Sequence, residues 1–410
     1  MASPAYIVDC VRTAAGRRKG RLSKWHPADL GAAVIDGLVD RVGMSGSLVD
    51  DVIMGCVSQY GAQTANLCRT SVLASKKLPL EVPGVTVDRQ CGSGQQAIHF
   101  AAQAVMSGTQ DVVIAAGVEV LYERVKTDSM SLVPIGSPVL DGIKYGSDDS
   151  DYDDGRGNPY ATTGIQDKYG KGVMFSQFKG AELLAKEYQL TREEIDEFSH
   201  SSHIKAGQAT KKGVFSNEIV PLQGTDRKTG EVVLHDKDEG IRYNPNLAKM
   251  KSLKPLQEGG VVSAAAASQI SDGAAAMLIC NEEGLKKIDA RPRARIVALA
   301  LAGSDPVMML KGPIPATKAV LKKAGMSLGD IDIYEVNEAF ASVPLAWAKA
   351  LKADMKKLNV NGGAIALGHP LGCTGVKLMT TLVNTLEREN KRYGLLAICE
   401  GGGTANATVI

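Results

Sequence analysis

The sequence has few aromatic residues and almost no net charge. Phe, Trp and Tyr make up 5% of its 410 residues, and 47 basic residues stand against 45 acidic ones, for a formal net charge of +2. Bulk nucleic-acid binding needs a basic surface, and a platform for single strands needs aromatic rings, so the composition argues against both. No apolar run is long enough to span a bilayer. We therefore expect no nucleic-acid partner and no membrane span.

Cysteine is also scarce, and its pattern is not that of a disulfide framework or a zinc site. The seven cysteines are an odd number scattered through a long chain, and no Cys-x-x-Cys pair occurs. This favours reduced thiols in a cytosol-like compartment. Five histidines have no neighbours at metal-ligand spacing, so we expect structural or surface roles for them and no metal site. They are His26, His99, His200, His203 and His235.

Targeting and dinucleotide-binding signals are missing as well. The N-terminal residues lack the charged-then-apolar order of a secretory signal, and the final residues, NATVI, are unlike a peroxisomal SKL-type tripeptide. We predict a cytoplasmic protein, with an organelle matrix left open. Gly92-Ser93-Gly94 lacks the third glycine of a dinucleotide fingerprint, so an NAD-dependent enzyme is a distant alternative.

What the sequence does contain is the pattern of an α/β enzyme. It is 44% hydrophobic, has 44 glycines, and is too long for one ordinary core, which predicts two or three domains. A strand is expected at 83–88, a helix buried nearly all round at 95–106, and a strand at 111–116. This order predicts a parallel βαβ unit.

The two ends of the chain resemble each other, which indicates an internal duplication. The C-terminal third repeats the plan, with strands expected at 331–336, 358–360 and 395–399 and a helix at 375–386. Gly43-Met44-Ser45 and Gly325-Met326-Ser327 each stand just before a predicted strand.

The middle of the chain differs from both ends. Residues 123–270 contain an acidic run at 148–154, an amphipathic helix near 179–188 and a capping-box pattern at Thr191-Arg192-Glu193-Glu194. We interpret this region as an inserted loop or lid domain. The acidic run is expected to be a solvated loop, with a binding function as the lesser alternative.

Cys91 is the first residue that could carry chemistry. It lies between a predicted strand and the helix near Gln95, and a helix N-terminus favours a thiolate through its unpaired N–H groups. The adjacent Gly92-Ser93-Gly94 would let a substrate approach the backbone. Most cysteines are inert core residues, but this position favours a nucleophile.

Three further polar groups fall at strand ends or in glycine-rich turns. His369 lies in Gly368-His369-Pro370, Asn337 follows the strand at 331–336, and Cys399 ends a strand that runs into Glu400-Gly401-Gly402-Gly403. Open α/β sheets place their sites at such strand ends. Three consecutive glycines predict a tight turn with exposed N–H groups suited to an oxyanion.

These segments together resemble the signature blocks of the thiolase family, in order and in spacing, over nearly the whole chain. The blocks are Cys91-Gly92-Ser93-Gly94, Asn337-Glu338-Ala339-Phe340-Ala341, Gly368-His369-Pro370 and Cys399-Glu400-Gly401-Gly402-Gly403, with Ala267-Ser268 and Asp272-Gly273-Ala274-Ala275-Ala276 as a fifth.

The resemblance implies a function for each residue. Cys91 would be acylated as a thioester, His369 would be the base that activates it, and Cys399 would exchange the α-proton of the second acyl-CoA. Asn337 would hold a water beside His369 in one oxyanion hole, and the N–H groups of Cys91 and Gly401 would form another.

Two more residues are assigned to coenzyme A by resemblance. Ser268 would contact the pantetheine arm, and Arg227 stands roughly where the family places a basic residue near the adenylate. The family's Thr-Ala-Gly-Asn-Ala-Ser is here Ser263-Ala264-Ala265-Ala266-Ala267-Ser268, Ala405 replaces a glycine, and Gln177-Phe178 differs near the acyl pocket. These departures leave acyl-chain preference open.

The implied fold is a five-layered α-β-α-β-α arrangement of two similar halves. The expected domains are 1–122 with 271–292, the insertion at 123–270, and 293–410. The expected activity is reversible Claisen condensation of acetyl-CoA to acetoacetyl-CoA, or CoA-dependent thiolysis of 3-ketoacyl-CoA. Coenzyme A would be a substrate, with no tightly bound cofactor, and the protein would be a homodimer or homotetramer.

Alternatives remain at this point. A broad-chain degradative thiolase shares every residue named above, and a non-catalytic binding protein for acyl-CoA or lipid is the alternative of another class. A ketoacyl synthase is the nearest relative in chemistry, but such enzymes lack a second catalytic cysteine, so Cys399 argues against it.

Overall fold

The N-terminal half of the molecule is built on a seven-stranded mixed sheet. The structure is a computed structural model that describes residues 3–59, 61–121, 160, 162–173 and 175–410. The strand order is β4-β3-β5-β8-β1-β9, and β2 pairs with β8 at the side. The strands are β1 (Ala5–Arg12), β2 (Gly16–Arg17), β3 (Asp51–Gly55), β4 (Gly84–Val87), β5 (Val112–Glu119), β8 (Ser271–Cys280) and β9 (Ala294–Ile296).

The βαβ unit predicted around Cys91 is confirmed. α3 (Ser93–Ser107) connects β4 to β5, and both strands run parallel to β3, which lies between them. β8 is antiparallel to β5 and β1. The sheet is therefore parallel on the side that carries Cys91.

A second sheet repeats the arrangement of the first. It contains β10 (Ala298–Gly303), β13 (Thr404–Val409), β12 (Gly394–Glu400) and β11 (Ile333–Val336), in that order. Read from β11, the order β11-β12-β13-β10 matches β3-β5-β8-β1, with the same parallel and antiparallel pairs.

The helices before β3 and β11 show the same repeat. α1 (Pro27–Val42) ends at Gly43 with φ 73°, and α9 (Pro313–Ala324) ends at Gly325 with φ 65°. Both glycines adopt the left-handed conformation that stops a helix at little cost. A 3₁₀ turn and then a strand follow in each case. The repeated Gly-Met-Ser segments thus mark equivalent places in the two halves.

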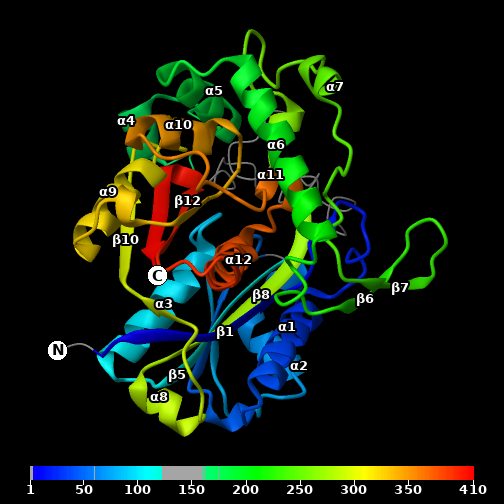
Figure 1. Ribbon diagram of the computed structural model, residues 1–410, viewed down its shortest axis with the longest axis vertical. Coiled ribbons are helices and arrows are strands. Elements are labelled where there is room, and N and C mark those ends of the chain that lie inside the picture. The colour runs from blue at the N-terminus through cyan, green and yellow to red at the C-terminus, as the bar shows by residue number, and fades with distance from the viewer. Residues whose placement is uncertain (1–2, 60, 122–159, 161, 174) are drawn as a thin grey trace.

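The two sheets enclose a layer of helices. α3 and α12 (Thr374–Arg388) pack on each other, and one buried cluster joins Ile98 of α3 and Leu382 of α12 to strands of both sheets. α1 and α2 (Leu67–Ala74) cover the outer face of the first sheet, and α9 and α10 (Ser342–Leu351) cover that of the second. Figure 1 shows α12 between the two sheets, so the predicted five-layered fold is confirmed.

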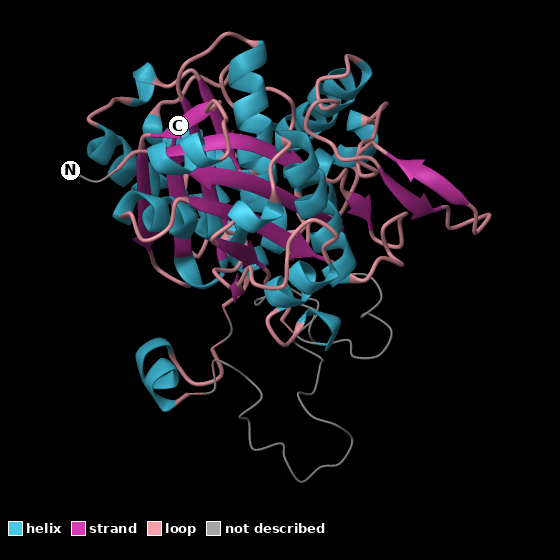
Figure 2. Cartoon of the chain, turned by 90° about the horizontal axis from the view of Figure 1, so that it is seen from below, coloured by secondary structure: helices cyan, strands magenta, loops and turns pink. Residues whose placement is uncertain are grey.

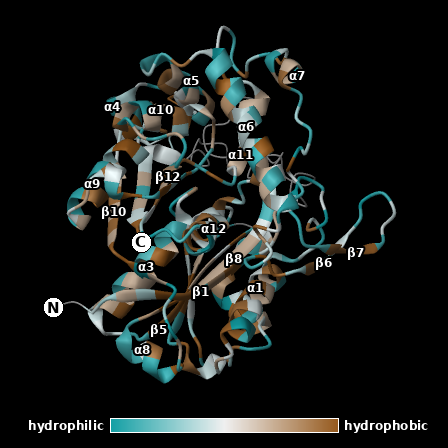
Figure 3. Ribbon diagram, viewed as in Figure 1, coloured by the Kyte–Doolittle hydropathy of each residue, from teal (hydrophilic) through white to brown (hydrophobic). Residues whose placement is uncertain are grey.

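Apolar residues follow these layers. The central strands are mostly hydrophobic, and hydrophilic residues lie along the outer helices (Figure 3). β5 and β8 are buried at every position, as expected for strands covered on both faces.

The middle region packs on the two halves through its described elements. They are α4 (Thr163–Tyr169), α5 (Gln177–Glu187), α6 (Arg192–Lys211), β6 (Leu222–Thr225), β7 (Val232–His235) and α7 (Leu247–Lys251). The predicted capping box is present, since Thr191 and Glu194 bond each other's backbone N–H groups. The β6–β7 hairpin projects from the body (Figure 2). The acidic run at 148–154 lies outside the described residues.

One predicted strand is wrong. Residues 358–360 form isolated bridges only, one of them from Leu358 to Tyr334. Asn359 has φ 44°, a left-handed conformation that breaks an extended run. Its side chain instead bonds both backbone groups of Val336. The segment lies beside β11 in the second half, in the position that corresponds to β4 beside β3 in the first half. The chain turns at Asn359, too early to continue the ladder.

Candidate active site

Cys91 lies in the short loop between β4 and α3. Gln90 before it has φ 49°, and Gly92 after it is the N-cap of α3. The Ser93 hydroxyl closes the loop, because it accepts from Arg89 N and donates to Gln90 O. Cys91 is 4% exposed. The sequence therefore folds here into a tight turn that fixes a buried cysteine at a helix start.

Glycines bring the His369 loop against the Cys91 loop. A Cβ on Gly94 would lie 2.8 Å from the Gly372 carbonyl oxygen, and a Cβ on Gly375 would lie 1.9 Å from the backbone N of Gln95. Side chains at either place would push the starts of α3 and α12 apart. Cys91 and His369 are 278 residues apart in the sequence. Their loops meet because Gly94 and Gly375 have no side chains.

The hydrogen bonds of His369 determine which ring nitrogen carries the proton. The Thr374 hydroxyl donates to Pro370 O at 2.8 Å, so its oxygen can only accept from His369 Nδ1, 2.7 Å away. Nδ1 is therefore protonated, and Nε2 is left as a hydrogen-bond acceptor. Asn337 Nδ2 donates to Nε2 at 3.4 Å. The ring is held as a neutral base whose reactive nitrogen faces Asn337.

Electrostatics keep this histidine uncharged. Burial and then the positive charge of Lys377 lower the pKa of His369 to about 3. Lys377 is itself buried, and its Nζ lies 3.5 Å from the carbonyl oxygen of Gly368. An imidazole in this environment accepts a proton only while a negative charge forms nearby.

The helix N-terminus does not make Cys91 a resting thiolate, contrary to the expectation from sequence. Burial, and next the Glu400 carboxylate, raise the pKa of Cys91 to about 12. The desolvation cost outweighs the favourable field of the helix. Cys91 is a thiol at rest and needs a base to react.

Cys399 lies at the end of β12, close enough to Cys91 for their charges to interact. Burial and then Cys91 raise the pKa of Cys399 well above the usual value for a thiol. Gly401 starts the turn that follows, and a Cβ on it would lie 2.9 Å from Gln90 Oε1. Gly402 and Gly403 have φ 76° and 79°, so the predicted tight glycine turn is confirmed. It packs directly on the Cys91 loop.

The comparison with protein families decides the identity. Residues 5–283 match the family model of the thiolase N-terminal domain, and residues 290–410 match that of the thiolase C-terminal domain. The chain belongs to the thiolase family. It is accordingly an acyl-CoA C-acyltransferase, and the non-catalytic alternative is not favoured.

Individual relatives agree with this assignment. The chain is 49% identical to a steroid 3-ketoacyl-CoA thiolase of Mycobacterium tuberculosis, covering 99% of this chain and 93% of that one. It is 40% identical to a 3-ketoacyl-CoA thiolase of Idiomarina loihiensis, covering 98% of both. A crystal structure of the Bacillus anthracis acetyl-CoA acetyltransferase superposes with a TM-score of 0.85 at 33% identity, covering 100% of this chain and 98% of that one.

The two residues expected to bind coenzyme A lie in different settings in this thiolase. Ser268 is half-buried, and its backbone N donates to Ala339 O, two residues after Asn337. Gln269 O in turn accepts from His369 N at 3.4 Å. Ser268 therefore borders the site. Arg227 is exposed in the turn between β6 and β7, and no described contact joins it to the catalytic loops.

Sequence reasoning missed two residues at the site. Thr374 orients His369, and the signal for it was a hydroxyl five residues after the histidine, at the start of a helix. Glu400 was named only as part of a motif. The signal for it was an acidic residue between a buried strand and a glycine turn, which is an unusual place for a charged side chain.

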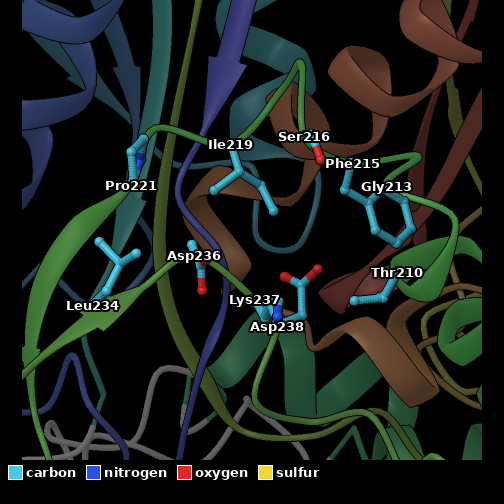
Figure 4. A pocket seen from close by; sticks show the side chains of 10 residues that line it. All are labelled: Thr210, Gly213, Phe215, Ser216, Ile219, Pro221, Leu234, Asp236, Lys237 and Asp238. Atoms are coloured by element: carbon cyan, nitrogen blue, oxygen red, sulfur yellow. The ribbon is translucent and has the colours of Figure 1, made fainter.

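A hollow beside the hairpin is separate from this site. The cavity, about 310 Å³, is lined by the end of α6, the segment between α6 and β6, Leu234 of β7 and the segment after β7. It contains none of the predicted site residues (Figure 4). Its buried carboxylate, Asp238, is already held by Arg12 through two hydrogen bonds of 2.8 and 3.0 Å. The group that could attract a ligand is thus occupied.

The described residues contain no cluster of three or more His, Cys, Asp or Glu side chains that could hold a metal ion. Among the same residues, no helix has both the length and the apolar character needed to cross a membrane.

Proposed function

We propose that this thiolase cleaves 3-ketoacyl-CoA with coenzyme A, and condenses acyl-CoA in reverse, through an acyl thioester on Cys91. The observation that carries the proposal is the arrangement around His369. A neutral imidazole with its Nδ1 proton bound to Thr374 presents Nε2 as a proton acceptor, in a buried loop that packs against the Cys91 loop.

In the first half-reaction the Cys91 sulfur attacks the keto carbonyl while its proton passes to His369 Nε2. The bond between the α- and β-carbons then breaks, and acetyl-CoA leaves as an enolate that takes a proton from Cys399. In the second half-reaction the thiol of coenzyme A gives its proton to the Cys399 thiolate and attacks the thioester. Cys91 leaves as the sulfur leaving group and takes its proton back from His369, which returns both cysteines to thiols.

Each group is matched to its step by its surroundings. The raised pKa of Cys399 makes it a thiol that can give a proton to a strongly basic enolate and regain one in condensation. Asn337 Oδ1 is buried without a partner among the described residues, so its amide is not fixed by a second bond and is available to a bound water. The N–H groups of Cys91 and Gly401 would face the other developing oxyanion.

Coenzyme A would be a substrate and not a resident cofactor, with acetyl-CoA, acetoacetyl-CoA or a longer 3-ketoacyl-CoA as partner. Ser268 is the proposed pantetheine contact because its backbone N–H donates to Ala339 O, which places it beside the segment that carries Asn337. Arg227 is a proposed contact for the nucleotide end, where an exposed cation on a projecting hairpin could meet a phosphate.

The deciding experiment compares kcat/KM for CoA-dependent cleavage of acetoacetyl-CoA, a linear medium-chain 3-ketoacyl-CoA and a ring-bearing 3-ketoacyl-CoA. The last is included because one relative is named for steroid substrates. Cleavage of acetoacetyl-CoA alone would indicate a closed acyl pocket. A preference for the longer or bulkier substrates would indicate an open acyl pocket. No cleavage of any would contradict the proposal.

We also propose a homodimer or homotetramer in the cytoplasm. β4 is an edge strand, and Leu80 and Val85 beside it are 69% and 44% exposed. An unpaired edge with apolar side chains favours pairing with a second copy. Light scattering of the purified protein tests this, and a monomer at micromolar concentration would contradict it.

We also propose a division of the chain into domains. Residues 1–122 with 271–292 and residues 293–410 would be the two halves, and 123–270 the insertion. The repeated sheet order supports the two halves.

A further inference from the structure

Glu400 is a fully buried carboxyl at the point where the two cysteines meet. It follows Cys399 at the end of β12 and has no exposed surface. Oε2 accepts from the Thr404 hydroxyl at 2.6 Å, whereas Oε1 is buried with no hydrogen-bond partner among the described residues. A Cβ on Gly92 would lie 1.9 Å from Oε1. The carboxyl therefore rests on the residue next to Cys91 and fills the space that a side chain there would need.

The charges around Glu400 leave it only partly compensated. Arg89 and Asp88, both on the loop after β4, act on the pKa of Glu400 in opposite directions, and Arg89 Nε is buried with no hydrogen-bond partner among the described residues. The Thr404 hydroxyl and the Asn406 backbone favour the ionised form. Burial outweighs them and raises the pKa of Glu400 to about 8. The carboxyl is therefore neutral at neutral pH and ionises on the alkaline side.

A charge at this position acts on both thiols. The ionised carboxyl is the largest charge acting on Cys91, and it also acts on Cys399. Negative charge beside a thiol opposes formation of the thiolate, and low-dielectric surroundings strengthen the effect. A neutral carboxylic acid at the same place imposes no such penalty.

We propose that Glu400 is a positioning residue that controls the ionisation of Cys91, permitting thiolate formation while it is protonated and opposing it once it is ionised. The proposal rests on the proposed function in taking Cys91 as the nucleophile. Glu400 exchanges no proton with the substrate, because the thiol proton passes to His369 and the enolate proton comes from Cys399. Its effect is confined to the charge beside the sulfur.

The test is the pH dependence of alkylation of Cys91 by iodoacetamide, followed by mass spectrometry of the Cys91 peptide in the full-length protein. Glu400→Gln keeps the shape of the side chain and cannot ionise. We expect equal rates for the two proteins below about pH 7, and a rate roughly threefold to tenfold higher in the variant near pH 9. Superimposable profiles would overturn the proposal, and so would a uniform increase at every pH, which indicates a loosened fold.

Thr404→Val provides a second route if Glu400→Gln does not fold. Removing the hydroxyl takes away a hydrogen bond that favours the carboxylate, so ionisation of Glu400 and the slowing of Cys91 should move to higher pH. No displacement would count against the proposal. Glu335→Gln is the matched control, since this buried carboxyl on β11 is not among the groups that act on Cys91, and its profile should equal that of the wild type.

The outcome separates this proposal from the proposed function. Alkylation requires no substrate, so a shifted profile in a protein that cleaves no acyl-CoA would support the coupling of Glu400 to Cys91 and contradict the catalytic assignment. Full turnover with identical profiles would support the catalytic assignment and overturn the function given to Glu400.

Discussion

His369 donates its Nδ1 proton to the Thr374 hydroxyl, 2.7 Å away, and that hydroxyl donates its own proton to the carbonyl of Pro370. The threonine thereby fixes the tautomer of a histidine whose other nitrogen would accept the thiol proton in the proposed reaction. Because the three residues lie at the junction of the His369 loop and α12, the start of this helix sets the direction of the imidazole ring.

Replacing Thr374 with valine should lower kcat/KM by about tenfold to a hundredfold, because the unsupported ring can adopt the wrong tautomer or turn away. The loss of two buried hydrogen bonds should destabilise the fold by about 2 kcal/mol. Steady-state kinetics and urea unfolding measure the two effects. Thr374→Ser keeps the hydroxyl and should recover most of the activity. Wild-type kcat/KM in Thr374→Val would contradict this function of the hydroxyl.

Cys91→Ser should abolish turnover and covalent labelling by radioactive acetyl-CoA. A serine hydroxyl is a far weaker nucleophile than a thiol, and the base at hand is a histidine with a low pKa. Cys280→Ala is a suitable control, since Cys280 is buried at the far end of β8 and its loss leaves the site intact. Near-normal activity of Cys91→Ser would overthrow the assigned nucleophile.

Cys399→Ala should block condensation while leaving Cys91 able to take up an acyl group. The α-proton of the second acyl-CoA then has no acceptor, whereas the first half-reaction from acetyl-CoA needs only Cys91 and His369. Quantifying the acyl-enzyme by mass spectrometry beside the rate of acetoacetyl-CoA formation separates the two steps. If the variant failed to acylate, the functions of the two cysteines would have to be reassigned.

Stability should decrease on the acid side because buried histidines resist protonation. Burial lowers the pKa of His99 and of His369 to about 3 each, against about 6.5 in an unfolded chain. Between these values the unfolded state binds more protons, so the free energy of unfolding falls as pH decreases through this window.

His99→Gln isolates one of these contributions. From pH 7 to pH 5 the wild type should lose roughly 2 kcal/mol more than the variant, because buried carboxyls affect both proteins alike and cancel. Urea unfolding at the two pH values gives this difference. Equal losses of unfolding free energy in the wild type and the variant would contradict the prediction, because His99 would then take up a proton as readily in the folded protein as in the unfolded chain.

Much of the fold could be predicted from the sequence because its signals are local. The buried helix over α3, the β-branched runs of β4 and β5 and the capping box at Thr191 depend on neighbours a few residues apart. The strand expected at 358–360 failed for a reason that no local pattern contains. Asn359 adopts a left-handed conformation because its amide bonds Val336 and Glu338, which come from another part of the chain.

The candidate site divides in the same way. The sequence by itself determined which side chains are proposed to carry the chemistry, since Cys91, Asn337, His369 and Cys399 stand in motifs whose glycines and strand ends are visible in the sequence. Only the tertiary structure decided their protonation states. The thiol of Cys91 is protonated at rest and His369 is neutral because burial removes the water that would stabilise a charge, and burial is a property of the assembled layers. Glu400 became part of the site through the close packing of the two halves, which places its carboxyl against Gly92 of the Cys91 loop. Thr374 differs, because it reaches His369 within one loop, five residues along the chain.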